Sequence, residues 1–220
     1  MGLSIFEAFL RIEPTIKRLV TFVDGQALYR AAKDAFGYIF PNYDVRKLSE
    51  QIAAKQEWQL ANVYFYTGIP DYADNSLWHD FWASKLAVMG TRGIITFSRP
   101  VRYANEEVKL RDGSTQIVRV GHEKGIDVRI ARLAIENVYD VALVFSQDQD
   151  LSEVSDEIRK ISQQQGRWIR IASAYPISPS SINRRGINNT EWVTIDKSMY
   201  DACIDPIDYR PKSRFNPLLP

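Results

Sequence analysis

The chain has 220 residues, of which 45% are hydrophobic and 12% aromatic, which is enough for one folded domain with additions. Its 28 Lys and Arg residues nearly balance its 27 Asp and Glu residues, so any contact with nucleic acid must come from a local basic face. The single cysteine excludes an intramolecular disulfide, and two histidines argue against a zinc site.

The first half of the chain alternates expected strands with expected helices. Residues 1–17 suggest a packed N-terminal extension or a short helix, without a signal-peptide pattern or a membrane span, so we expect a cytoplasmic protein. Apolar runs predict strands at 18–23, 60–66 and 93–97, and periodic apolar positions predict helices at 26–36, 44–55 and 75–89. This alternation is typical of an α/β fold with a parallel sheet covered on both faces.

The segment that follows, 101–120, breaks the alternation. Asp112-Gly113 separates two charged, β-prone stretches, and Asp-Gly is a strong hairpin signal. We expect an inserted β-ribbon, 102–110 against 115–120, that carries Arg102, Lys109, Arg111 and Arg119. Such a ribbon is either a solvated arm or a surface that contacts phosphates.

The second half returns to alternating elements. The pattern predicts a helix at about 126–135, a buried strand at 141–145, a helix at 150–165, and strands at 168–172 and 192–195. A loop rich in Ser and Asn, 178–189, contains Arg184 and Arg185. We therefore expect an N-terminal extension (1–17), one α/β domain (18–196) and a C-terminal helix or extended tail (197–220).

Four aspartates occupy related places in this pattern. Asp24 ends the first strand, Asp127 opens the helix before the fourth strand, and Asp148 and Asp150 follow that strand. In open α/β sheets, ligands bind at the carboxyl ends of strands where the strand order reverses, so we expect the four to converge. Carboxylates without His or Cys suit Mg²⁺ or Mn²⁺, which assist attack of water on phosphodiesters. Lys124 would neutralise charge there.

Each of these residues also has a simpler explanation. Asp24 would be a turn residue ahead of Gly25, and the later pair would be a helix N-cap with a solvated neighbour. Lys124 would be a surface lysine beside a helix. The residues alone leave both interpretations open.

Three segments resemble the motifs of the NYN family, which includes LabA-like proteins and belongs to the PIN-like nuclease superfamily. The family motifs run approximately FIDGxN, KGVDV and SGDSDF, and the similar segments here are Phe22-Val23-Asp24-Gly25-Gln26, Lys124-Gly125-Ile126-Asp127-Val128 and Ser146-Gln147-Asp148-Gln149-Asp150-Leu151. The resemblance spans about residues 19–195. It implies a PIN-like (Rossmann-like) fold and metal-dependent RNA cleavage. The implied catalytic acids are Asp24, Asp127, Asp148 and Asp150, of which the first three would hold the metal, with Ser146 as a hydroxyl near the substrate.

Three positions depart from the family pattern. Ala27 replaces the Asn of the first motif, which removes a polar contact near the metal. Gln147 and Gln149 replace the Gly and Ser of the third motif, and a Gln in place of Gly stiffens the turn. An inactive member that only binds RNA would show the same changes.

We expect a metal-dependent ribonuclease, cutting within RNA, that uses Mg²⁺ or Mn²⁺. The alternative is an inactive RNA-binding or regulatory module of the same fold. A third class, another phosphotransfer enzyme, fits less well. A phosphatase would place Asp-x-Asp on the first strand, and Asp24-Gly25-Gln26 does not supply it. The expected partners are RNA, a regulatory protein such as an antitoxin, and a second copy of the chain. Residues nominated to bind substrate are Ser146, Lys124, Arg102, Lys109, Arg111, Arg119, Arg184 and Arg185.

Overall fold

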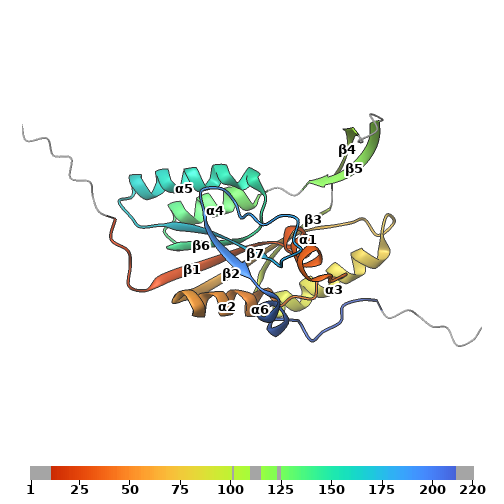
Figure 1. The fold of residues 1–220 in the computed structure, drawn as a ribbon, viewed down its shortest axis with the longest axis horizontal. Coiled ribbons are helices and arrows are strands. Elements are labelled where there is room, and N and C mark those ends of the chain that lie inside the picture. The colour runs from red at the N-terminus through yellow and green to blue at the C-terminus, as the bar shows by residue number, and fades with distance from the viewer. Residues whose placement is uncertain (1–10, 101, 110–114, 123–124, 212–220) are drawn as a thin grey trace, which may run out of the picture.

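The protein is built on a six-stranded parallel sheet (Figure 1). The computed structural model describes residues 11–100, 102–109, 115–122 and 125–211, with backbone only between 100 and 122. The strand order is β3-β2-β1-β6-β7-β8. The strands are β1 (Lys17–Asp24), β2 (Trp58–Ile69), β3 (Ile95–Pro100), β6 (Val141–Phe145), β7 (Arg170–Pro176) and β8 (Glu191–Ile195). The expected α/β fold with a parallel sheet is confirmed.

Helices cover both faces of the sheet, as Figure 1 shows. One face carries α1 (Gly25–Phe36), α2 (Val45–Gln56), α3 (Ser76–Thr91) and α6 (Lys197–Ala202), and the other carries α4 (Ile126–Ile135) and α5 (Ser152–Gln164). Each face has its own apolar core, because alternate residues of a strand point to opposite sides. Val23 and Leu48 belong to the first core, and Phe22 and Ile130 belong to the second.

The order of the strands reverses between β1 and β6. From β1 the chain moves outward to β2 and β3, and it then returns to the other side of β1 to form β6, β7 and β8. Val23 of β1 is the register partner of Phe145 of β6, so the two strands end side by side. The residues that follow these two ends therefore lie next to each other, at the place where open α/β sheets bind ligands.

The inserted ribbon is confirmed. β4 (Arg102–Lys109) and β5 (Thr115–His122) pair in antiparallel register and form a separate two-stranded sheet. The ribbon extends away from the α/β body in Figure 1. Its turn, with Asp112-Gly113, lies outside the described residues.

The two ends of the described chain can be compared with the N-terminal extension and the C-terminal tail that we expected. Residues 11–16 form no helix, and β1 already begins at Lys17, while residues 1–10 lie outside the described part. After β8 the chain forms α6 and a buried, free Cys203. None of the helices described is both long enough and apolar enough to cross a membrane.

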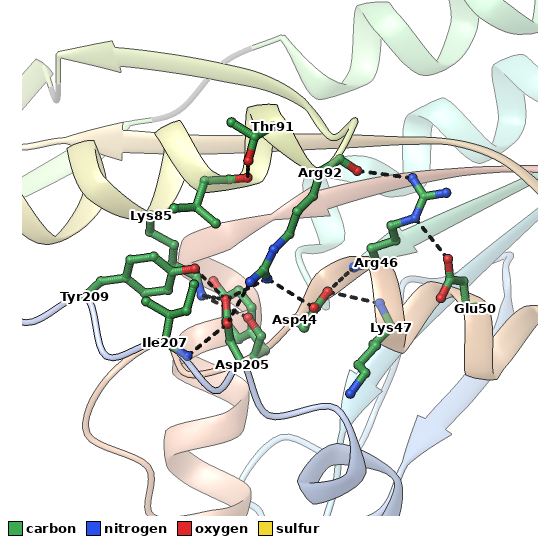
Figure 2. A network of polar contacts seen from close by, with 12 residues as sticks. Asp44, Arg46, Lys47, Glu50, Lys85, Thr91, Arg92, Asp205, Ile207 and Tyr209 are labelled. Carbon is green, nitrogen blue, oxygen red and sulfur yellow. Dashed lines mark hydrogen bonds and ion pairs between the residues drawn. The ribbon is translucent and has the colours of Figure 1, made fainter.

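A buried ionic network fixes the segment after α6 to the domain (Figure 2). Lys85 of α3 is fully buried; its Nζ donates to the carbonyl oxygen of Tyr43 at 2.9 Å and lies 3.7 Å from Asp205 Oδ2. Arg92 Nη1 contacts the same oxygen at 3.2 Å, and Tyr209 Oη donates to it at 2.7 Å. One carboxylate of the C-terminal segment thus neutralises two cations of the domain.

Candidate active-site groove

The turn after β6 is shaped by its own polar side chains. Ser146 is buried, and its Oγ accepts a hydrogen bond from the backbone N–H of Asp148 at 3.1 Å. Asp148 Oδ1 in turn accepts from the N–H of Asp150 at 3.1 Å, which caps the short 3₁₀ turn η1 (Gln149–Leu151) ahead of α5. We expected the helix to begin at Asp150, but Asp150 lies in η1, and α5 begins only at Ser152.

Asp24 closes β1 and caps α1. Its Oδ1 accepts from the N–H of Ala27 at 2.9 Å. Burial raises the pKa of this carboxyl above its ordinary value; the N–H groups of the following turn and Arg30 oppose that rise, and the charge of Asp148 adds to it. Asp24 and Asp148 therefore lie close enough for their charges to interact.

Gly25 lets the backbone approach β2 closely at this corner. A Cβ atom added to Gly25 would lie 2.5 Å from Phe65 Cζ, a distance that side chains do not tolerate. The carbonyl of Gly25 accepts a hydrogen bond from Tyr43 Oη at 2.8 Å. The Asp-Gly pair is thus required for packing as well as for turning the chain.

All four expected aspartates line one open groove of about 1850 Å³. Asp127 lies in the first turn of α4, after Gly125, which adopts the left-handed conformation at φ 116°. Asp127, Asp148 and Asp150 are exposed, and Asp24 is partly buried. These residues therefore share one groove, and their roles as metal ligands and catalytic acids stay predictions.

The four acids line the groove without forming a closed cage. In the described part of the chain, no group of three or more His, Cys, Asp or Glu side chains comes together as a metal-binding set. The donors still suit a hard cation, because all are carboxylate oxygens and two of them follow adjacent strands. Asp24 and Asp148 are the pair that would hold a cation, since the pKa of Asp24 is raised chiefly by burial and the charge of Asp148 adds to the rise.

Cationic side chains stand around the acids. Arg30 and Lys33 of α1, Arg99 at the end of β3 and Arg129 of α4 all line the groove. The Arg129 guanidinium lies 4.6 Å from the ring centre of Phe97, which fixes it against the sheet. We did not single out these residues from the sequence, although Arg30 lies six positions after Asp24 on a helix that begins at the site.

Aromatic rings form another part of the same groove. Tyr29 of α1 and Trp78 of α3 both line it, and their ring centres are 5.7 Å apart. Trp78 packs in turn against Phe40 and Phe81, so its position is set by the core. The groove therefore combines acids, cations and ring faces along one surface.

The residues nominated to bind substrate fall into three groups. Ser146 is 2% exposed and shapes the turn, which leaves no surface for a substrate. Arg184 and Arg185 are exposed but do not line the groove, and their side chains contact Pro179 and Asn188. Lys124 and Arg111 lie outside the described residues, as do the side chains of Arg102, Lys109 and Arg119, so these nominations remain predictions.

Comparison with known proteins supports the fold. No protein-family model matches the sequence, and no curated protein matches it. Among solved structures, a protein of unknown function from Vibrio parahaemolyticus aligns over 84% of this chain and 98% of its own, with a TM-score of 0.51 and 18% identity. At that identity the likeness concerns the architecture alone.

Proposed function

We propose that the protein is a divalent-metal-dependent ribonuclease of the NYN and PIN-like type that acts on RNA in the cytoplasm. The observation that carries the proposal is the pairing of Asp24 and Asp148 at the carboxyl ends of adjacent parallel strands, where the strand order reverses. Asp127 and Asp150 line the same groove. Mg²⁺ or Mn²⁺ bound there would supply an activated water and neutralise charge on the phosphate.

The protein's own residues would hold the RNA around these acids. Arg30, Lys33, Arg99 and Arg129 surround the groove and would bind phosphates on either side of the cleaved bond. The rings of Tyr29 and Trp78 offer faces on which unpaired bases stack. The ribbon begins and ends beside the groove, because Arg99 precedes it and Gly125 follows it.

The alternative is an RNA-binding module of the same fold without cleavage. Two observations favour it: Ala27 carries no polar group toward the site, and the described acids do not come together as a set of three. Such a module would use the same cations and rings. It would differ only in what a divalent ion does to bound RNA.

The test is cleavage of a panel of single-stranded and duplex RNAs by the full chain. Reactions with Mg²⁺ or Mn²⁺ are compared with reactions in chelator, and wild type is compared with Asp24→Asn. The proposal predicts products that require both the metal and Asp24. Binding without cleavage under every metal condition would instead identify the inactive module.

A further inference from the structure

The side chain of Gln147 binds the loop 178–189 to the turn after β6, residues 146–151, which we call the acidic turn. Its Nε2 donates to the carbonyl oxygen of Arg185 at 2.9 Å and to that of Asn183 at 3.2 Å. Gln147 immediately precedes Asp148. It occupies the position where the third motif of the resembled family has glycine, which could make neither bond.

Gln149, on the other side of Asp148, binds the same loop through both polar atoms of its side-chain amide. Its Nε2 donates to the carbonyl oxygen of Gly186 at 3.0 Å, and its Oε1 accepts from the N–H of Asn188 at 3.1 Å. A serine at this position is too short to reach both groups. The two residues that flank Asp148 are therefore both tied to one backbone segment.

The loop itself rests on the end of the sheet. Ile187 is fully buried, and its N–H donates to Ser173 Oγ at 3.2 Å, while that hydroxyl donates to the carbonyl of Ser146 at 2.7 Å. A Cβ atom on Gly186 would lie 2.6 Å from Trp192 Cδ1, so the backbone there is in close contact with the indole ring. The two glutamines thus bind a segment that also packs against β7 and β8 through Ser173 and Trp192.

The far part of the loop reaches α1. The N–H of Ile182 donates to Asp34 Oδ2 at 2.9 Å. Ile182 and Asn183 line the groove, and Ile182 is 91% exposed. The loop therefore runs from the acidic turn to α1 and forms one wall of the groove.

We propose that Gln147 and Gln149 are positioning residues that fasten this wall to the acidic turn and so hold Asp148 in place. The inference rests on the proposed function for what Asp148 does, but the fastening itself stands on the four hydrogen bonds. A catalytic carboxylate has to be held within about 0.5 Å, and an exposed turn reaches that precision only through surrounding bonds. Gln147 and Gln149, which depart from the family pattern, then contribute to the site and are not a sign of lost activity.

Hydrogen exchange on the full chain without RNA tests the fastening directly. In Gln149→Met the amide of Asn188 loses its acceptor, and we expect its hydrogen exchange to accelerate about tenfold. We expect the neighbouring amide of Ile187 to exchange faster as well. Gln164→Met is the matched control, because Gln164 is an exposed glutamine on α5 away from the groove. Unchanged exchange of Asn188 in Gln149→Met overturns the proposal.

Kinetics and metal affinity test the positioning. In Gln147→Met we expect kcat on RNA to fall about tenfold while KM stays within about twofold, because the phosphate-binding cations are untouched. The Gln147→Met/Gln149→Met pair should lose less than the product of the single effects, since both act on one loop. Wild-type kcat in both single variants overturns the positioning role.

The two proposals fail in different ways. If wild type cleaves no RNA, the proposed function fails, and binding of Mn²⁺ alone then decides the positioning role. An Mn²⁺ affinity reduced about fivefold or more in Gln147→Met, with Gln164→Met unchanged, supports it. Equal Mn²⁺ affinity in the two variants overturns it.

Discussion

Asp24 is held where its negative charge costs stability. Burial raises its pKa above the ordinary value of 3.8, and the charge of Asp148 adds to the rise. A carboxyl with a raised pKa in the folded state gives up its proton more readily when unfolded, so stability falls as pH rises from about 3.8 through the folded pKa. Ionising Asp24 in the folded protein therefore costs stability, and a bound cation would relieve that cost.

We therefore predict that Asp24→Asn stabilises the metal-free protein. Asparagine still caps α1, and the charge is gone, so the melting temperature should rise by roughly 2–4 °C, equivalent to about 1 kcal/mol. Mg²⁺ or Mn²⁺ should raise the melting temperature of wild type and leave Asp24→Asn unchanged. Differential scanning calorimetry in chelator and in metal gives both numbers.

Asp44→Asn is the matched control. Asp44 also caps a helix, but its carboxylate lies 3.3 Å from Arg92, so losing its charge should lower the melting temperature. If the melting temperature falls in both variants, Asp24 does not carry a charge that costs stability.

Single residues also mark the limit of prediction from sequence. The acids were found because strand ends and acidic residues coincide in the chain. Gln147 was taken as a stiffening substitution, whereas its side chain contacts backbone 36 and 38 residues further along. Every residue type has a backbone carbonyl, so a contact with one does not depend on the partner's side chain. The sequence pattern therefore could not predict these two contacts.

At the scale of elements, the C-terminal segment and α3 depend on each other. Lys85 is fully buried, and its pKa is lowered to about 8, chiefly by burial, with Asp205 opposing the change. Sequence patterns placed Lys85 on a helix but could not pair it with a carboxylate 120 positions away. The extended tail we expected from the last residues is, up to Arg210, a structural part of the domain.

We predict that Asp205→Asn is strongly destabilising. The substitution leaves Lys85 and Arg92 without their shared carboxylate, and breaking such a buried set costs about 3–5 kcal/mol. Urea unfolding measures the change. Asp208→Asn, three residues on, removes only an exposed pair with Arg210 and should have little effect. Equal losses in the two variants would refute the network's role.

The lowered pKa of Lys85 predicts a pH dependence with a definite sign. Between its folded value of about 8 and the ordinary 10.5, the folded protein has a neutral lysine and the unfolded chain a charged one. Unfolding then takes up a proton, so raising the pH stabilises the fold. The unfolding free energy of wild type minus that of Lys85→Met should rise from pH 8 to 10.5, and a flat or falling difference contradicts the assignment.

The face of α1 toward the groove should carry part of the RNA affinity. Each phosphate contact on a single strand contributes about 0.7 to the slope of log affinity against log salt. Arg30→Gln with Lys33→Gln should therefore flatten that slope by about 1.4. Lys47→Gln with Lys55→Gln on α2, outside the groove, is the control, and an equal slope in both double variants would place the RNA elsewhere.

For the whole molecule, the sequence predicted the architecture better than the site. Apolar runs located the strands because both faces of a parallel sheet are buried, and the order of elements indicated parallel pairing. The reversal between β1 and β6 brought the acids to one groove as expected. The distances between the acids and the cations around them depend on helix packing and loops, which local patterns do not encode.

Cleavage by Asp148→Asn compared with Glu153→Gln tests the central claim most directly. Asp148→Asn keeps the cap on η1 and removes one charge of the proposed metal pair, whereas Glu153 is exposed in the first turn of α5. With Mg²⁺ or Mn²⁺, the account predicts that Asp148→Asn loses cleavage by at least about a hundredfold while still binding RNA, and that Glu153→Gln cleaves like wild type. Cleavage by Asp148→Asn at the wild-type rate would contradict it.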